Sequence, residues 1–358
     1  MSDFIDELAL RVDKATQART PLCIQGGNSK AFYGGPCNGD PVDMRAWSGI
    51  VEYEPTELVI TVKSGTPLAT VEAALAEQQQ ELAFEPPRLS AQSTIGGTIV
   101  AGLAGPGRLA RGGVKDYVLG CTLIDGRGQI LHFGGVVMKN VAGYDVSRVI
   151  PGSMGTLGIV VDLSIKVMPM SVADSTLQFE CTAQQAIERT NTWLGQPLPI
   201  HATFWHQGQL HVRLRGAQAA VSAAEKTLGG AVLLPTLAQP FWASVRDQTH
   251  PFFTAPGPLW RIAVPPTTVD LPLHGQQVHE WASGLRWFRP DTPCAADALR
   301  GVAERCGGHA TLYRAEHDTD RQQAFHTPQR ALLDIQRRLK HQFDPAGIFN
   351  PGRLAPIL

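Results

Sequence analysis

The chain has 358 residues, 43% of them hydrophobic, and a formal net charge of −1. This length exceeds the size at which a single hydrophobic core usually stops growing, so we expect two domains or one domain with a large insertion. The Lys and Arg residues are scattered and form no basic run, which argues against a nucleic acid partner. The acidic residues 1–7 lack the basic and apolar segments of a secretory signal and favour the cytoplasm.

No segment has the pattern of a membrane span or a metal centre. Residues 89–107 carry no charge, but Gly, Ser and Thr interrupt them and their apolar blocks are too short to cross a bilayer. Any association with the inner membrane is therefore expected to be peripheral and to depend on a partner. The six cysteines stand far apart, without the two-residue spacing of zinc knuckles and iron–sulfur clusters. We interpret them as free thiols and expect no metal.

The first half of the chain predicts short strands and one clear helix. Three β-rich runs bounded by Gly or Pro predict strands at 22–25, 50–53 and 58–62. A helix should follow, with Thr66 as its N-cap, Pro67 at its first position and its end near Gln80. Farther on, 118–124 and 129–133 flank an Asp-Gly-Arg-Gly turn, which predicts a β-hairpin.

A strand predicted at 159–168 ends the first half, and from about Ser171 the pattern changes. The next elements are a strand at 175–181, a helix opened by a capping box at 182–185, strands at 202–205 and 210–214, and a helix at 217–228. This β-α-β-β-α-β order predicts a ferredoxin-like half, suited to a cap on the substrate side. Residues 240–320 read as a second, less regular set of the same elements, and 321–342 show helical spacing.

Four glycine-containing clusters stand beside these elements. Glycine lets the backbone approach a ligand closely, while small hydroxyls and backbone N–H groups donate hydrogen bonds. Such clusters are suited to holding a bulky phosphorylated cofactor. Lys139, Tyr144 and Asp145 within one of them would contact the ligand or hold the segment in place. The clusters are 26–30, 94–98, 139–145 and 152–159.

At these residues the sequence resembles the FAD-binding domain of the vanillyl-alcohol oxidase and p-cresol methylhydroxylase (PCMH) type. The resemblance covers about the first 170 residues and returns at 343–353, which is similar to the closing segment of that family. Within the family, 138–145 and 307–312 are most similar to the FAD-binding subunits of bacterial glycolate oxidase, or glycolate dehydrogenase.

The resemblance implies an α+β fold in three parts. A two-subdomain PCMH-type FAD-binding domain would occupy residues 1–170. A ferredoxin-like α+β cap domain, for substrate or interaction, would occupy 171–319. The C-terminal segment 320–358 would return to the FAD domain.

The same resemblance implies the cofactor site. The loop 26–29 would bind the diphosphate, Pro86 would approach the cofactor, Gly105 would lie on the diphosphate side, Ile159 would meet the adenine through its backbone, and Asn350 would reach the flavin. For each residue the alternative is simple loop geometry. The residues assigned to cofactor binding are Gly26, Gly27, Asn28, Ser29, Pro86, Thr94, Gly96, Gly97, Ala101, Gly105, Gly155, Gly158, Ile159 and Asn350.

The first glycine loop indicates that FAD is bound without a covalent link. Relatives that tether the flavin commonly have a histidine in this loop, whereas here it holds Asn28 and Ser29, and no His or Cys follows before Cys37. Gly102 stands where many relatives have Asn, so backbone or water would replace one side-chain contact there.

Residues 105–110 also fit the glycine fingerprint of dinucleotide-binding folds. Asp125 follows about twenty residues later, at the position where such folds have an acid that binds the ribose. A Rossmann unit needs a helix that continues beyond the third small residue. Gly112 and Gly113 would interrupt that helix, and a strand is already predicted from Val118. We therefore reject a nicotinamide cofactor.

The sequence does not single out catalytic residues. Oxidation of a 2-hydroxy acid requires a cation for the carboxylate and a base for the hydroxyl or Cα proton. The alternative for each candidate is a solvated or hydrogen-bonded side chain. The His-rich metal motif of catalytic flavoproteins that act on D-2-hydroxy acids is absent. The candidates are His206, His211, Arg213, Arg261, His309 and Arg314.

The resemblance implies an FAD-binding subunit of a glycolate oxidase complex. A small 2-hydroxy acid would be the substrate, a larger FAD-containing subunit the more favoured seat of glycolate oxidation, and an iron–sulfur subunit the electron acceptor. One alternative is a self-sufficient FAD-dependent dehydrogenase or oxidase of another hydroxy acid or alcohol. Another is a non-catalytic assembly subunit that has kept the flavin fold.

Overall fold

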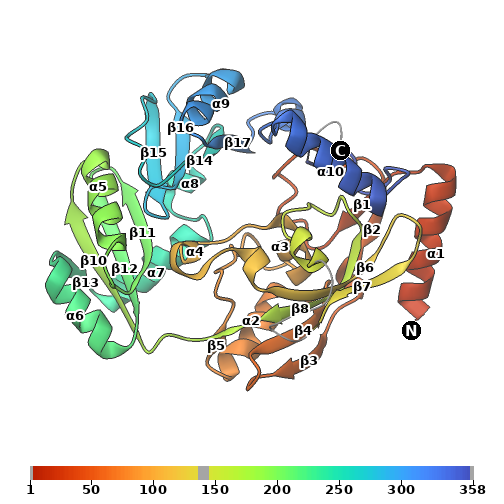
Figure 1. The fold of residues 1–358 in the computed structure, drawn as a ribbon, viewed down its shortest axis with the longest axis horizontal. Coiled ribbons are helices and arrows are strands. Elements are labelled where there is room, and N and C mark those ends of the chain that lie inside the picture. Colours follow the sequence, from red (N-terminus) through yellow and green to blue (C-terminus); the bar gives the residue numbers. More distant parts are fainter. Residues whose placement is uncertain (1–2, 136–144, 355–358) are drawn as a thin grey trace.

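The computed structural model describes residues 3–135 and 145–354. Two β-sheets dominate the described residues, a five-stranded sheet from the first half of the chain and an eight-stranded sheet from the second. Figure 1 shows the first sheet in orange to yellow-green and the second in green to blue, in different parts of the molecule. The combination of helices with mostly antiparallel sheets confirms the expected α+β class.

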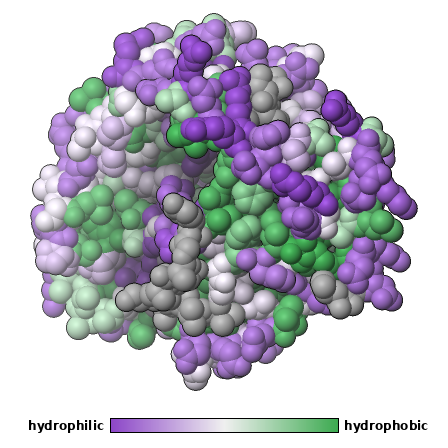
Figure 2. All heavy atoms as spheres, turned by 45° about the vertical axis from the view of Figure 1, so that its right-hand side comes forward, coloured by the Kyte–Doolittle hydropathy of each residue, from purple (hydrophilic) through white to green (hydrophobic). Residues whose placement is uncertain are grey.

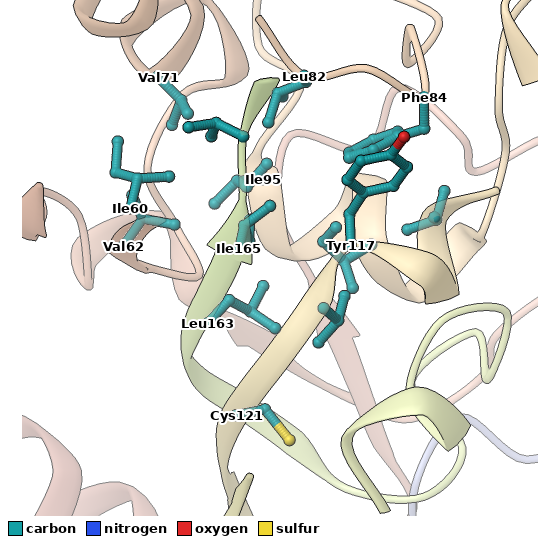
Figure 3. Packing of buried hydrophobic residues seen from close by; sticks show 14 of the residues in the cluster. Ile60, Val62, Val71, Leu82, Phe84, Ile95, Tyr117, Cys121, Leu163 and Ile165 are labelled. Carbon is teal, nitrogen blue, oxygen red and sulfur yellow. The ribbon is translucent and has the colours of Figure 1, made fainter. Parts of the chain in front are cut away.

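The five-stranded sheet is antiparallel and has the order β3-β4-β8-β6-β7. α2 (Leu68–Glu77) and α3 (Ile95–Ala101) contribute to its hydrophobic core. Figure 3 shows Val71 of α2 and Ile95 of α3 in the same cluster as Ile165 of the sheet. The strands are β3 (Ile50–Glu54), β4 (Val59–Lys63), β6 (Val118–Ile124), β7 (Ile130–Gly134) and β8 (Ile159–Lys166).

A second core brings the two ends of the chain together. It contains residues of α1 (Asp3–Ala18), of the parallel strands β1 (Leu22–Gln25) and β2 (Asp40–Asp43), and of the C-terminal segment. Leu22 forms a β-bridge with Phe349, which follows α10 (Arg330–Phe343). In Figure 1 the blue C-terminal segment accordingly returns to the red N-terminal elements.

The eight-stranded sheet consists of two halves with one strand order, and we call this sheet and its helices the cap. The first half reads β13-β10-β12-β11, and the second reads β17-β14-β16-β15 from the opposite edge. This confirms both the β-α-β-β-α-β half and its less regular repeat, which has no helix between its first two strands. The first half comprises β10 (Ala173–Glu180), α5 (Ala183–Leu194), β11 (Ile200–His206), β12 (Gln209–Gly216), α6 (Gln218–Leu228) and β13 (Ala231–Leu233).

The second half of the cap begins with two helices that precede its strands. α7 and α8 connect it to the first half, and β11 pairs with β15 where the halves meet. The elements are α7 (Pro235–Arg246), α8 (Pro251–Thr254), β14 (Leu259–Ala263), β15 (Gly275–Glu280), β16 (Leu285–Pro290), α9 (Ala296–Arg305) and β17 (His309–Arg314).

The limits of α2 differ from the expected ones. The helix begins at Leu68, and Pro67 rather than Thr66 occupies the N-cap position. The Thr66 hydroxyl instead accepts a hydrogen bond from Gly49 N at 2.9 Å and donates one to Lys63 O at 2.7 Å, so it holds the preceding turn. The helix ends at Glu77, before the short strand β5 (Gln80–Glu81), which pairs with β9 (Met168–Pro169).

The single helical segment expected at 321–342 is also interrupted. A short 3-10 helix covers Asp318–Gln323, and α10 starts only at Arg330. Pro328 explains the break, because a proline disfavours helical backbone at the residue before it.

Residues 105–110 do not open a Rossmann helix. α4 (Arg108–Arg111) has four residues and ends at Gly112, whose φ of +86° suits glycine. β6 begins six residues later, so the described backbone agrees with the rejection of the dinucleotide fingerprint.

Candidate functional site

Three of the four glycine clusters meet at one cavity, whose empty space, including the part open to solvent, is about 770 Å³. The segment after β1, helix α3 and the turn before β8 form its walls, and the C-terminal segment contributes Asn350 and Arg353. We call it the glycine-loop cavity. Of the residues assigned to cofactor binding, its lining includes Gly26, Gly27, Asn28, Ser29, Thr94, Gly96, Gly97, Ala101, Gly155, Gly158 and Asn350.

Several of these glycines are required by the protein's own packing. A Cβ atom on Gly27 would lie 1.5 Å from Gln92 O, and one on Gly26 would lie 2.2 Å from Thr94 Oγ1. A Cβ on Gly96 would lie 2.7 Å from Ser64 O. A side chain at any of these positions would push the contacting segments apart. Gly26 and Gly27 therefore allow the first loop to pack against residues 92–94, and Gly96 allows α3 to pack against Ser64.

Gly97 differs from its neighbours because its missing side chain faces open space. A Cβ there would meet only Thr94 Oγ1, at 3.2 Å. Its backbone N–H donates to the same oxygen, because Thr94 is the N-cap of α3. Since Gly97 also lines the cavity, a larger side chain at this position would project into it.

The diphosphate loop predicted at 26–29 presents polar groups to the cavity. Asn28 has a φ of +52°, a left-handed conformation that Asn tolerates better than most residues. The Ser29 hydroxyl lies 2.9 Å from the hydroxyl of Ser93, which precedes α3. The loop is therefore linked to the start of α3 by side-chain hydroxyls.

Lys30 is a buried cation in the lining of this cavity. Its side chain belongs to a residue only 8% exposed, and burial lowers its pKa to about 8. Among the described residues, its ammonium has one hydrogen bond, a long one of 3.5 Å to Ser29 Oγ. No Asp or Glu stands among the described residues that line the cavity. The cavity thus carries uncompensated positive charge.

Asn350 and Arg353 line the cavity, but their side chains already form hydrogen bonds with other residues of the chain. The Asn350 side chain accepts from Ile24 N at 2.7 Å and donates to Met154 O at 2.8 Å, which joins three segments. Arg353 donates to backbone carbonyls of the first loop, including Lys30 O at 2.8 Å. Asn350 therefore has a structural role whether or not it reaches the flavin.

Three assigned residues lie outside the lining of the glycine-loop cavity. Ile159 is fully buried in the core shared by the chain ends, although its neighbours Gly158 and Val160 line the cavity. Pro86 lines no cavity that we describe here. Gly105 lines a different cavity, beside the cap.

The fourth glycine cluster falls mostly outside the described residues, and with it Lys139 and Tyr144. Asp145 is described, and it accepts hydrogen bonds from Ser147 Oγ at 2.6 Å while pairing with Arg148 at 2.6 Å. These contacts support the alternative that Asp145 holds its segment in place.

A second cavity, of about 320 Å³, lies between residues 103–106 and the cap. Pro87 and Gly105 line one side of it, and Arg261, Glu280 and Trp287 line the other. We call it the Arg261 cavity. Burial raises the pKa of Glu280 to about 7, and its Oε1 accepts a 2.6 Å hydrogen bond from Trp287 Nε1. A carboxyl group that titrates near neutrality marks a candidate functional site.

The other polar candidates of the cap have partners or are held neutral. Arg213 pairs with Glu85 at 3.0 Å, and Arg314 donates to Phe253 O at 2.8 Å. His206 packs against the ring of Phe252, and His211 stacks on Phe241. Burial, with the nearby His250, lowers the pKa of each histidine to about 4. Burial also lowers the pKa of His309. Arg261 alone of these six residues lines the second cavity.

In the part of the chain that the structure describes, no group of three or more His, Cys, Asp or Glu residues is placed to hold a metal ion. None of the helices described is long and apolar enough to cross a membrane.

Comparison with known proteins identifies the family. Residues 4–134 match the FAD binding domain family. Glycolate oxidase subunit GlcE of Escherichia coli (strain K12) is 43% identical over 352 residues, which cover 98% of this chain and 97% of that protein. The chain belongs to the GlcE family. FAD, expected from the glycine loops, is confirmed as the cofactor by the FAD binding domain matched in this chain.

Other relatives match less of the chain. Glycolate oxidase subunit GlcD of Bacillus subtilis (strain 168) is 32% identical over 176 residues, 48% of this GlcE-family chain and 37% of GlcD. A solved structure of p-cresol methylhydroxylase with substrate bound has a TM-score of 0.73 and 14% identity, over 98% of this chain and 88% of that one. This likeness confirms the PCMH-type fold.

Sequence reasoning assigned no role to several residues of the glycine-loop cavity. Lys30 is the last residue of the first cluster. The sequence around it gives no sign that its ammonium is buried, or that no Asp or Glu stands among the described residues of the lining. Arg353 closes the C-terminal segment, and its contacts depend on the return of that segment to the first loop. Further residues of the lining are Ile24, Gln25, Ala31, Met44, Ser64, Val100, Met154 and Val160.

Proposed function

We propose that this chain is the FAD-binding subunit of a glycolate oxidase complex and takes part in the flavin-mediated oxidation of glycolate to glyoxylate. The glycine-loop cavity carries the proposal, because it joins three glycine loops to a buried lysine in a lining whose described residues include no acid. The similarity to a glycolate oxidase subunit over 98% of the chain supports the substrate and the complex.

The residues of the cavity fit FAD. Backbone N–H groups of the loop 26–29, the Ser29 hydroxyl and the Lys30 ammonium would hold the diphosphate, because phosphate oxygens accept hydrogen bonds from such donors. Gly97 would leave room for the cofactor. No His or Cys stands among the described residues of the lining, which supports non-covalent binding. Bound FAD would supply the two-electron acceptor of the reaction.

Pro86, Gly105 and Ile159 keep the roles implied by the resemblance as proposals. Pro86 would approach the cofactor and Gly105 would lie on its diphosphate side, with Gly105 and the neighbouring Pro87 both in the lining of the Arg261 cavity. Ile159 would offer its backbone between two residues that line the glycine-loop cavity. The proposed domain limits remain 1–170, 171–319 and 320–358.

The complex would contain a larger FAD-containing subunit and an iron–sulfur subunit that receives the electrons. It would be cytoplasmic, with any contact to the inner membrane made through its partners. The GlcE and GlcD relatives are both named as subunits of glycolate oxidase, which supports a multi-subunit enzyme.

The test is a visible spectrum of the purified chain, followed by anaerobic addition of glycolate, first alone and then with the GlcD-like partner. A flavin spectrum that bleaches only with the partner is the expected result. Bleaching by glycolate alone would instead favour a self-sufficient dehydrogenase. A folded chain without flavin, even after incubation with FAD, would contradict FAD binding and favour the assembly subunit.

A further inference from the structure

The Arg261 cavity stands apart from the glycine-loop cavity, at the other end of the segment that starts with α3. The first cavity is lined by Thr94, Gly96, Gly97, Val100 and Ala101 of this segment, and the second by residues 103–106. The cap closes the second cavity with Arg261 of β14, Glu280 of β15 and Trp287 of β16.

Arg261 has no hydrogen bond or ion pair with any other residue that the structure describes. Its guanidinium lies 5.3 Å from the ring centroid of Trp281, and that of Arg108 lies 4.8 Å from the same ring. The two arginines repel each other, and burial together with Arg261 lowers the pKa of Arg108. An arginine without an acid partner beside a second arginine favours the entry of an anion.

The acid nearest to this pair compensates the charge only in part. Glu280 is 4% exposed, and burial keeps it partly protonated near neutral pH, even though Arg261 and the hydrogen bond from Trp287 oppose this effect. The nearby charge of Glu85 also favours the protonated form. The cavity therefore retains positive charge near pH 7.

The turn that carries Trp281 is strained and fixed in place. Trp281, Ala282 and Ser283 have φ values of +54°, +53° and +70°, in the left-handed region that non-glycine residues rarely occupy. Trp281 Nε1 donates to Gly105 O at 3.1 Å, and Ala282 N donates to Thr203 Oγ1 at 2.8 Å. The turn thus holds the aromatic ring beside both arginines and ties the cap to residue 105.

We propose that the Arg261 cavity binds a small carboxylate, with the Arg261 guanidinium donating to the carboxylate oxygens. A monocarboxylate of two or three carbons, such as a 2-hydroxy acid, matches the charge of the cavity and the two donors that one guanidinium edge presents. The proposal rests on the proposed function, because it gives this chain its own site for the substrate class of the complex.

Other titratable groups surround Arg261, and each is either neutral or paired at pH 7. Arg246 also lines the cavity, but Asp247 neutralises it at 2.7 Å. Tyr33 and Tyr313 are buried near Arg261, and burial raises the pKa of each, so both are neutral at pH 7. His309 lies on the neighbouring strand and is kept neutral by burial and by Arg261.

The experiment is calorimetric titration of the full FAD-loaded chain with acetate, which has the carboxylate but no oxidisable hydroxyl. Saturable binding of one acetate per chain is expected. Arg261→Met should weaken it at least tenfold, and Arg261→Lys should restore part of the loss because it keeps the charge without the planar fork. Glycolate, titrated anaerobically, should compete with acetate for the site.

The pH dependence gives a second measurement. A bound anion favours the protonated form of Glu280, so the affinity for acetate should fall as the pH rises through about 7. Glu280→Gln should remove this dependence while leaving the affinity close to that at pH 6. Arg108→Met, which alters the second arginine without changing the lining, should weaken binding by no more than about threefold.

Acetate binding that is unchanged in a folded Arg261→Met variant would overturn the proposal. So would the absence of saturable binding to the folded, flavin-loaded chain. If the chain holds no flavin, the proposed function fails, but the same titration of the flavin-free chain still tests the carboxylate site. The two failures are therefore distinguishable.

Discussion

Gly97 and its neighbouring glycines look alike in the sequence but differ in what requires them. The backbone of another segment occupies the space beside Gly27, whereas the space beside Gly97 belongs to the cavity. Substitution of Gly27 therefore tests packing, and substitution of Gly97 tests the cofactor site. This difference allows a direct test of FAD binding.

We expect Gly97→Val to fold but to lose its flavin, because the branched side chain would occupy the space of the cofactor. The flavin-to-protein ratio after purification measures the effect. Wild type with FAD at about a hundredfold over its dissociation constant should gain roughly 2.7 kcal/mol of stability, and the variant should gain none. Gly301→Val, in the cap helix α9, is the control and should keep its flavin. Normal flavin content in Gly97→Val would contradict the assigned loop.

Lys30 should bind the cofactor through its charge. Lys30→Met should weaken FAD binding by about ten- to a hundredfold, as expected for a lost hydrogen bond to a charged group of roughly 1.5–3 kcal/mol. Its pKa of about 8 in the free chain should rise when the diphosphate binds, so FAD binding takes up a proton above pH 8. Wild-type affinity should therefore fall as the pH rises through 8.

Fluorescence titrations with FAD between pH 7 and 9.5 measure this dependence. Lys30→Met should show no such fall, and Lys30→Arg should bind FAD with little pH dependence because its charge persists. A wild-type affinity that is constant across this range would argue against contact between Lys30 and the diphosphate.

At the scale of elements, the C-terminal segment is attached through one buried lysine. Lys340 Nζ donates to Thr156 O at 2.7 Å, to Asp344 Oδ2 at 2.7 Å and to Phe349 O at 3.0 Å, which uses all three of its protons. Asp344 in turn accepts from Ile348 N and Phe349 N. α10 and the segment that carries Asn350 are therefore held to the turn before β8.

We expect Lys340→Met to lower the free energy of unfolding by about 3–5 kcal/mol, because it leaves the fully buried carboxylate of Asp344 without its cation. Urea denaturation measures the loss. Arg337→Met, on the same helix but in an exposed pair with Asp334, should change stability by no more than about 0.5 kcal/mol. Equal stability of the two variants would show that Lys340 does not anchor the segment.

Local sequence patterns predicted most helices and strands, but they could not predict contacts between elements that are distant in the sequence. The capping box of Thr182 and the turn at 125–128 act over a few residues, and the structure confirms the helix and hairpin they predict. The role of Thr66 depends on Gly49, and Pro328 shows that a local signal was overlooked. Among the described residues, neither Lys30 nor Arg261 has an acidic partner, and this follows only from how distant segments pack.

At the scale of the molecule, exposed hydrophobic residues are scattered over the described surface. Figure 2 shows hydrophobic patches separated by hydrophilic residues on one face. Exposed hydrophobic residues occur in several elements, including Leu332 and Ile335 of α10 and Leu234 and Leu237 near the start of α7. Scattered exposure of this kind is normal for a folded surface and marks no single interface among the described residues.

Contact between the cap and the first half of the chain centres on Glu85. This side chain pairs with Arg213 and Arg215 of β12 at 3.0 and 3.6 Å, and its other oxygen accepts from Gly107 N at 2.7 Å. Burial would raise its pKa, but His201 and the two arginines lower it to about 2. The carboxylate therefore joins β12 to the segment that leads to Gly105 and the Arg261 cavity.

We expect Glu85→Gln to lower the free energy of unfolding by about 2 kcal/mol at pH 7, because the amide keeps the shape but loses the charge. Since the folded pKa lies below the usual value of 4.5, the contribution of Glu85 is fully present above about pH 4.5 and is lost as the pH falls towards 2. Urea denaturation of both proteins should show a constant difference from pH 7 to 5 that narrows below 4.5. Glu188→Gln, an exposed change on α5, should match wild type throughout. A Glu85→Gln variant as stable as wild type at pH 7 would mean that hydrophobic packing alone seats the cap.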